Sequence, residues 1–292
     1  MYELIQVGAD TFYIQCPAKM GIYRASDDEV YLIDSGNDKD AGRKVDKIFK
    51  EQGWKAAAII NTHSNADHIG GNKLLLDRWD CAAYALGTER RFAEKPILEP
   101  SFLYGGYPFA PLRNKFLMAQ ASESRDIDAL ALPAGMEYIE LPGHYFDMIG
   151  IKTPDDVWFL ADCMSGANII EKYHLSFIYD VRAYLQTLDL VETLEGKLFI
   201  PAHAEPAERI AELSACNRKK VLEICATLLD ILKTPLLFEE VLEKIFLHYA
   251  LTMDFNQYVL IGSTVRSYLS YLYDEGKVIA EVRDARMLWS RV

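Results

Sequence analysis

The positions of the histidines constrain this chain more than any other feature of its sequence. It has six histidines, and four of them follow short apolar stretches. His63 and His68 come after AAAII, and His144 comes after MEYIEL. His203 comes after LFIP, and Asp162 closes the stretch VWFLAD. Ligands bind beyond the carboxyl ends of strands in layered α/β proteins. If these stretches are strands of one sheet system that run the same way, we expect the five side chains to meet at one edge.

The segment NTHSNADHIGG places several polar side chains in one short loop. His63, Asn65, Asp67 and His68 all lie within this loop, directly after an apolar stretch. Imidazole and carboxylate groups together suit zinc, iron or manganese. The cysteines form no CxxC pair that would compete as a source of ligands. The loop therefore predicts a metal site.

Strand-like and helix-like segments alternate from the N-terminus to about residue 206. Helices are predicted over 39–52, through LLLDRW, and over 181–195. The predicted strands are TFYIQ, MGIYRA, VYLID, AAAII, MEYIEL, VWFLAD and KLFIPA, of which the last three are expected to be buried. This alternation predicts sheets covered by helices, an α/β or layered α+β domain over residues 1–206.

The remaining residues, 207–292, have a different pattern. Apolar side chains recur at helical spacing over 206–232, 238–249 and about 263–274. Two short strands around a polar turn at 283–286 are expected to follow. Helices followed by a terminal hairpin are typical of a winged-helix module. Acidic and basic residues nearly balance in this region, so we favour a small helical domain without a nucleic-acid role.

The charge balance and the cysteines indicate the setting of the protein. The chain has 31 lysine and arginine residues against 43 aspartate and glutamate residues, a net charge of −12. An acidic surface repels phosphates, so a small molecule rather than a nucleic acid is the expected partner. No signal peptide or long apolar span is visible, and the five cysteines are scattered. These features predict a cytoplasmic protein that has no membrane partner.

The order of the motifs resembles that of the metallo-β-lactamase fold superfamily of hydrolases. The family pattern HxHxDH corresponds to residues 63–68, and its later ligands correspond to His144 in PGH, Asp162 in LADC and His203 in PAHA. Asp34 in YLIDSG matches a supporting aspartate of the family. Several matched elements in order are a specific signal. The resemblance implies a four-layer αββα sandwich over residues 1–206, with metals at one edge.

The resemblance also implies how the metals are held and where this chain departs from the family. One metal position takes ligands from residues 63–68 and from the PGH turn, and the other has a complete set of ligands. A single aspartate bridges the two positions. The first set is His63, Asn65, His144 and Asp162, and the second is Asp67, His68, Asp162 and His203. The family has histidine where this chain has Asn65, and an amide oxygen is a poorer ligand for zinc. We expect one or two divalent ions, zinc first, with iron or manganese as alternatives.

The implied activity is hydrolysis of a small ester, thioester, lactone or amide. A bound metal lowers the pKa of water from about 15.7 to about 7, which makes metal-bound hydroxide available as the nucleophile. Asp67 matches the aspartate that orients this nucleophile in the family, and with a single metal it serves as general base.

Four further features are open to more than one interpretation. Tyr145 either donates a hydrogen bond in the site or packs beside it, and His174 either contacts substrate or is a structural loop histidine. Cys163 is interpreted as a packing residue rather than a soft ligand. The aromatic segment 101–120 either lines a substrate pocket, forms a dimer contact or packs internally. The oligomeric state is left open, a homo-oligomer included.

Three other functions remain as alternatives. Members of this fold with a winged-helix-like tail resemble endoribonucleases, so a nuclease or phosphodiesterase is the second hypothesis. A degenerate, non-catalytic ligand-binding protein is the third, motivated by Asn65. An iron-based redox role is the fourth, because flavodiiron relatives have a carboxylate where Asn65 stands.

Overall fold

A seven-stranded sheet forms one half of the N-terminal part of the chain. The computed structural model describes residues 2–292. The strands are β1 (Glu3–Gln6), β2 (Thr11–Gln15), β3 (Met20–Arg24), β4 (Glu29–Ile33), β5 (Lys55–Ile60), β6 (Ala82–Ala85) and β7 (Arg125–Asp126). They are neighbours in sequence order. β1 to β4 pair antiparallel, and β4 to β7 pair parallel.

A second sheet of four strands faces the first. It consists of β8 (Glu137–Glu140), β9 (Ile149–Lys152), β10 (Val157–Phe159) and β11 (Leu198–Ile200), in the order β11-β10-β9-β8. β10 and β11 are parallel, and β9 is antiparallel to both β8 and β10. β8, β10 and β11 therefore run in the same direction, and their carboxyl ends lie at one edge.

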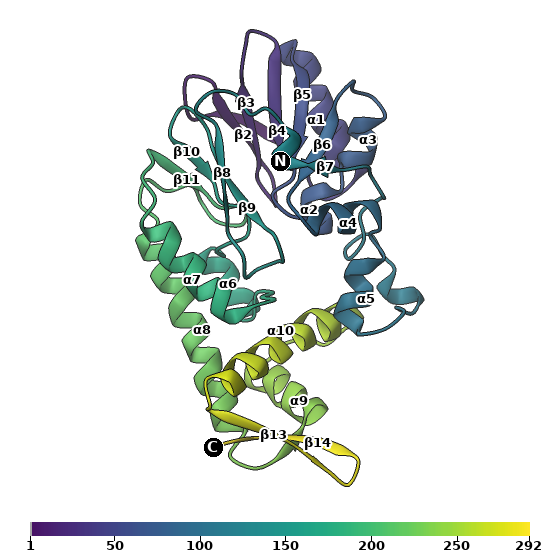
Figure 1. The fold of residues 1–292 in the computed structure, drawn as a ribbon, viewed down its shortest axis with the longest axis vertical. Coiled ribbons are helices and arrows are strands. Elements are labelled where there is room, and N and C mark those ends of the chain that lie inside the picture. The colour runs from purple at the N-terminus through teal and green to yellow at the C-terminus, as the bar shows by residue number, and fades with distance from the viewer. Residues whose placement is uncertain (1) are drawn as a thin grey trace.

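Helices cover the outer faces of both sheets, and apolar side chains fill the space between them. The outer core of the first sheet includes Val45 and Phe49 of α1 (Lys39–Gln52) and Leu75 of α3 (Asn72–Leu76). The second sheet packs against α7 (Val181–Glu192) through residues such as Leu188. A third cluster joins the facing sheets through Ile60 and Phe159, among others. Figure 1 shows this arrangement in the upper part of the molecule. The predicted αββα fold is confirmed.

The predicted bounds of α1 agree with the structure because both ends of the helix carry local signals. The Asp38 side chain accepts hydrogen bonds from the backbone N–H groups of Asp40 and Ala41. At the other end, Gly53 has φ of 72° and donates back to the last turn. The other helices of this part are α2 (Ala66–Ile69), α4 (Glu89–Glu94), α5 (Leu98–Tyr104) and α6 (Ala167–Tyr173), with short 3-10 turns at Ala110–Leu112 and Ile127–Ala129.

The strands before the candidate ligands are divided between the two sheets of the predicted sandwich, since β5 lies in the first sheet and the others lie in the second. Two expectations about this part are corrected by the structure. β8 is an edge strand with exposed Glu137 and Glu140, so the prediction that MEYIEL is buried is wrong. The helix predicted through LLLDRW ends at Leu76.

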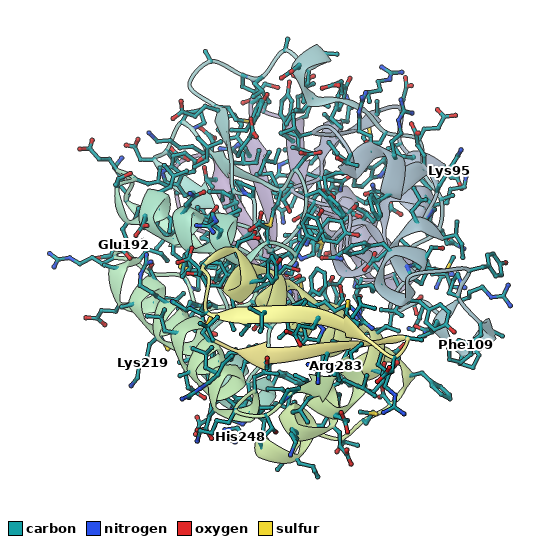
Figure 2. The ribbon with its side chains drawn as sticks, turned by 60° about the horizontal axis from the view of Figure 1, so that its bottom comes forward. Lys95, Phe109, Glu192, Lys219, His248 and Arg283 are labelled. Atoms are coloured by element: carbon teal, nitrogen blue, oxygen red, sulfur yellow. The ribbon has the colours of Figure 1, made fainter. Side chains whose placement is uncertain are left out.

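The C-terminal region consists of helices and a small sheet. Its elements are α8 (Ala211–Ile231), β12 (Leu236–Leu237), α9 (Phe238–His248), α10 (Phe255–Asp274), β13 (Val278–Arg283) and β14 (Arg286–Arg291). The sheet order is β12-β14-β13. α10 begins earlier than the predicted 263 because Asp254 caps it by accepting from the Gln257 N–H. Figure 2 shows the hairpin in front, with exposed His248 at the outer surface.

The C-terminal region shares a core with the helices on the second sheet. Tyr184 and Leu188 of α7 belong to the same buried cluster as Leu228 of α8 and Tyr268 of α10. The chain therefore buries apolar side chains across the predicted boundary at residues 206 and 207, and that boundary stays a prediction. Among the described helices, none is both long and apolar enough to span a membrane.

Candidate metal centre

The predicted ligands come together at the meeting edge of the two sheets. The segment after β5 supplies residues 63–68, of which Asp67 and His68 lie in the short helix α2 rather than in a loop, and the loop after β8 supplies His144. Asp162 and His203 follow β10 and β11. Two groups have ligand atoms that all lie within 4.8 Å of one another: His63, His144 and Asp162 form one, and Asp67, His68 and His203 form the other. The prediction that these segments converge is therefore met.

The second group is held close around Asp162. His203 Nε2 lies 3.2 Å from both Asp67 Oδ2 and Asp162 Oδ2. His68 Nε2 lies 3.1 Å from Asp162 Oδ1. Two carboxylates and two imidazoles thus face one point, which is a donor set suited to zinc.

The first group includes the amide that stands where the family has an imidazole. His144 Nε2 lies 2.9 Å from Asn65 Oδ1 and 3.7 Å from Asp162 Oδ2. The His63 and His144 rings are 5.1 Å apart between centroids. Asp162 therefore lies between the two groups, with one oxygen toward His68 and the other toward His144 and His203.

Every ligand histidine presents Nε2 to the centre, because Nδ1 is held elsewhere. The acceptors for Nδ1 are Thr62 Oγ1 for His63, Asp34 Oδ2 for His68, the Phe177 carbonyl for His144 and the Pro17 carbonyl for His203, at 2.8 to 3.2 Å. Such partners fix the tautomer and the orientation of a metal-binding imidazole. Asp34 also accepts from the Thr62 N–H and hydroxyl, and it is held at φ of 61°. It therefore has the supporting position that the resemblance implies.

Buried polar atoms without partners show that this donor set fits a metal. Within residues 2–292, His63 Nε2, His68 Nε2 and Asp162 Oδ1 make no hydrogen bond, although the last two atoms lie only 3.1 Å apart. An unsatisfied buried polar group costs about 1–3 kcal/mol. These atoms all belong to the two groups described above, so a divalent cation that binds them would remove that cost.

The charges of the centre differ between its two groups. Burial lowers the pKa of His63 and of His144, so that both rings are neutral and keep a lone pair for a metal. Burial also opposes the charged form of His203, but the Asp162 and Asp67 carboxylates outweigh it and raise the pKa to about 10. Binding of a cation to His203 therefore displaces a proton.

The turn that carries His144 requires glycine. Gly143 has φ of 124°, in the region that favours glycine. A Cβ at this position would lie 2.3 Å from the Tyr184 backbone nitrogen of α7. The Gly143 carbonyl accepts from the Tyr179 and Asp180 N–H groups. The PGH motif is therefore a packing requirement as well as a source of a ligand.

Comparison with known proteins agrees with this geometry. Residues 14–203 match the sequence profile of the metallo-beta-lactamase superfamily. This match covers more than half of the chain and all of the ligands. The chain belongs to the metallo-β-lactamase superfamily.

Relatives of this superfamily member are distant. It is 31% identical over 81 residues to the probable metallo-hydrolase YqgX of Bacillus subtilis, a match to 28% of this chain and 37% of that protein. It is 31% identical over 83 residues to the probable metallo-hydrolase YflN of the same organism, a match to 28% and 29% of the two chains. The matched segments thus span well under half of these relatives.

Solved structures resemble the whole chain. A metallo-beta-lactamase family protein from Thermus thermophilus, TTHA1429, has a TM-score of 0.73 at 17% identity over 100% of this chain and 98% of its own. A beta-lactamase domain protein from Burkholderia ambifaria has a TM-score of 0.72 at 17% identity, over 99% and 94%. The metallo-beta-lactamase from Pontibacter korlensis has a TM-score of 0.55 at 14% identity, over 75% and 98%. The likeness shows the fold, including that of the C-terminal region.

Two buried glutamates beside the candidate ligands of this superfamily member were not predicted from its sequence. Glu89 of α4 accepts from the Ser64 N–H and hydroxyl, at 2.9 and 2.5 Å, and from the Asp147 N–H at 2.8 Å. It thereby joins the loops that carry His63 and His144. Glu99 of α5 accepts from Asn65 Nδ2 at 2.8 Å. Neither glutamate belongs to a motif, so no local signal marks it.

The Glu89→Gln substitution is expected to change how stability depends on pH. Burial raises the pKa of Glu89 from 4.5 to about 7, so the folded state keeps its proton where the unfolded chain has lost it. This contribution is present below pH 4.5 and is lost as the pH rises toward 7. Glutamine does not titrate, so it shows no such dependence. The free energy of unfolding of the unmodified protein, compared with that of Glu89→Gln and measured without metal, should therefore fall by about 3 kcal/mol between pH 4.5 and 8. Urea unfolding of both proteins measures it, and a constant difference would contradict the assignment.

Tyr145 and His174 both pack against aromatic side chains. The Tyr145 ring is fully buried against Phe92, Phe146 and Phe177, and within residues 2–292 its hydroxyl has no hydrogen-bond partner. The packing interpretation describes its ring. The His174 ring stacks on Tyr249 of the C-terminal region, with centroids 4.9 Å apart.

Cys163 and His174 belong to neither candidate ligand group. Cys163 is fully buried and lies outside both ligand groups, as expected of a packing residue. His174 is not among the described residues that line the cavity above the metal centre. Its contact with substrate stays a prediction.

A cavity of about 370 Å³ opens above the ligands. Asn65, Asp67, His144 and Asp162 form part of its lining. Its apolar walls are Leu103, Phe116, Leu117, Phe177 and Leu260. The 101–120 segment therefore supplies a wall of this cavity, and α10 of the C-terminal region supplies Leu260.

Proposed function

We propose that this protein is a metal-dependent hydrolase of a small ester, thioester, lactone or amide with an apolar group. The observation that carries the proposal is the complete candidate ligand set of Asp67, His68, Asp162 and His203, of which Asp67 and Asp162 line an apolar-walled cavity. Superfamily membership and the probable metallo-hydrolase relatives support the hydrolase class.

Asp67 has the position expected of the residue that holds the nucleophilic water. Its side chain is 41% exposed, whereas His68 beside it is fully buried and Asp162 is 11% exposed. Burial opposes its charged form, but His68 and His203 hold the pKa of Asp67 below its usual range. The carboxylate is thus ionised and can accept a hydrogen bond from water. Divalent metals of such sites supply Lewis acidity and a lowered pKa of water.

The cavity wall supports a small substrate with an apolar part. Seven apolar residues line it, the five named above together with Pro17 and Ala66, and Lys115 is the lysine among the described lining residues. Lys115 lies 3.0 Å from Asp38, which neutralises its charge. A nuclease groove would need several basic groups along the phosphate path. A small-molecule partner, as the acidic chain also suggests, therefore fits this cavity better than a nucleic acid.

Elemental analysis of protein purified without added metal is the first test, followed by hydrolysis assays. The assays compare acetyl and hexanoyl esters, the matching thioesters and amides, and a lactone, each with the metal-loaded and the metal-free protein. We expect bound divalent metal, zinc first, and metal-dependent turnover that favours the hexanoyl group. Failure to bind zinc, iron or manganese would instead support a ligand-binding protein without turnover. Metal binding without turnover of any of these bonds would reject this substrate class.

The Asn65→His substitution is expected to raise the metal content toward two ions per chain. An imidazole is a stronger zinc ligand than an amide oxygen, so the first position should stay filled during purification. Elemental analysis of both proteins, prepared side by side, measures the change. An unchanged content would mean that geometry rather than ligand type limits this position.

A further inference from the structure

The Asn65 side chain does not have the role that its backbone position predicts. Asn65 is the N-cap of α2, where asparagine ordinarily accepts a hydrogen bond from the first turn. It makes no such bond. Instead, its Nδ2 donates to Glu99 Oε1 at 2.8 Å, and its Oδ1 lies 2.9 Å from His144 Nε2. The amide is therefore held by contacts with Glu99 and His144 rather than by the first turn of α2.

Glu99 decides which end of this amide faces the ligands. Nδ2 donates to Glu99 Oε1, and a carboxyl group has an acceptor oxygen in either protonation state, so Oδ1 is left turned toward His144. The Phe177 carbonyl can only accept, so His144 Nδ1 carries a hydrogen and Nε2 is the ring nitrogen that faces Asn65. Asn65 Oδ1 and His144 Nε2 therefore lie 2.9 Å apart, close enough for one cation to bind both. Nearby, His63 Nε2 has no partner within residues 2–292. Acceptors that converge in this way favour a bound cation.

We propose that Glu99 is a positioning residue that makes Asn65 a metal ligand at the first position. Glu99 is only 5% exposed and lies in the first turn of α5, so its carboxyl group is held in place. The Asn65–Glu99 pair thus stands where the superfamily has a single histidine. The amide oxygen completes the first group with two imidazoles and Asp162. This inference rests on the metal binding proposed above.

Zinc titration of the metal-free protein against a competing chelator tests the role of Glu99. Glu99→Leu removes the acceptor and should weaken the weaker of the two zinc equilibria by about 10- to 100-fold. Glu99→Gln keeps an acceptor oxygen and should bind zinc nearly as the unmodified protein does. The tighter equilibrium should be unchanged in both variants, which also shows that they are folded. Glu94→Leu is the matched control, because Glu94 pairs with Arg91 and belongs to neither ligand group.

A double-mutant cycle separates positioning from a general effect of the buried charge. In an Asn65→Ala background, Glu99→Leu should cause no further loss of zinc affinity, because the residue acts through Asn65. Asn65→Ala alone should weaken the same equilibrium by about 10- to 100-fold. That arm also decides the matter if Glu99→Leu does not fold.

Four results would overturn the proposal. These are unchanged zinc affinity in folded Glu99→Leu, unchanged affinity in Asn65→Ala, the same loss from Glu99→Leu with and without Asn65, and equal losses in Glu99→Gln and Glu99→Leu. The first would support a reversed amide, with a protonated Glu99 that donates to Asn65. If no zinc binds at all, the proposed function fails. If the tighter zinc equilibrium persists and the affinity of the weaker one does not change when Glu99 is substituted, this inference alone fails.

Discussion

The His203→Ala variant should lose more than about 100-fold in zinc affinity at the second position. Removal of a mere partner of a ligand costs about 10- to 100-fold, and His203 is itself a ligand. Its Nε2 lies 3.2 Å from carboxylate oxygens of both Asp67 and Asp162. Without the His203 ring, these two negative charges lose a neighbouring group that offsets their repulsion. Chelator competition and elemental analysis measure the loss.

Asn65→Ala is the comparison for this experiment. Asn65 contributes a neutral amide to the first position, whereas His203 contributes an imidazole to the complete one. We therefore expect His203→Ala to retain less metal than Asn65→Ala under the same purification. Equal losses would show that the two groups do not differ in strength as their ligands suggest.

The Asp67→Asn variant should lower kcat by about 10²- to 10⁴-fold on the substrate class that the unmodified protein hydrolyses. Contributions of this size are typical of a group that accepts a proton from the nucleophile. The amide has nearly the same shape and keeps one oxygen, but it cannot hold the proton of the attacking water. The assay requires variant and unmodified protein at equal metal content, which elemental analysis establishes.

Asp77→Asn provides the control for this effect. Asp77 is an exposed aspartate that pairs with Lys73 on α3, and it belongs to neither ligand group. Its substitution should leave kcat unchanged. If Asp67→Asn hydrolyses substrate as fast as the unmodified protein at equal metal content, Asp67 does not hold the nucleophile.

The ligand residues could be predicted because their signals are local. His63, Asp67 and His68 lie within six residues after a strand, and strand ends are recognisable from short apolar runs. Helix α1 was predicted with its observed bounds, since Asp38 and Gly53 act on adjacent backbone groups. Which of these strands lies in which of the two sheets was not predicted, because apolar runs do not state which strands pair.

The supporting glutamates could not be predicted for a different reason. Glu89 contacts a residue 25 positions away, and Glu99 contacts one 34 positions away. In the sequence, both resemble ordinary helical glutamates near the start of a helix. Their burial and their partners exist only after α4 and α5 pack over the ligand loop.

The sequence alone was enough to predict the candidate ligands and the departure at Asn65, because residue type and short spacing decide these features, and the order of the motifs implied the four-layer fold through the resemblance to a family. Only the tertiary structure decided that Glu99 orients Asn65, that Glu89 joins two ligand loops, and that Leu260 of the C-terminal region walls the cavity. These features depend on contacts between distant segments. Such contacts form when the two sheets and the C-terminal helices bury their apolar faces together, and no local pattern records them.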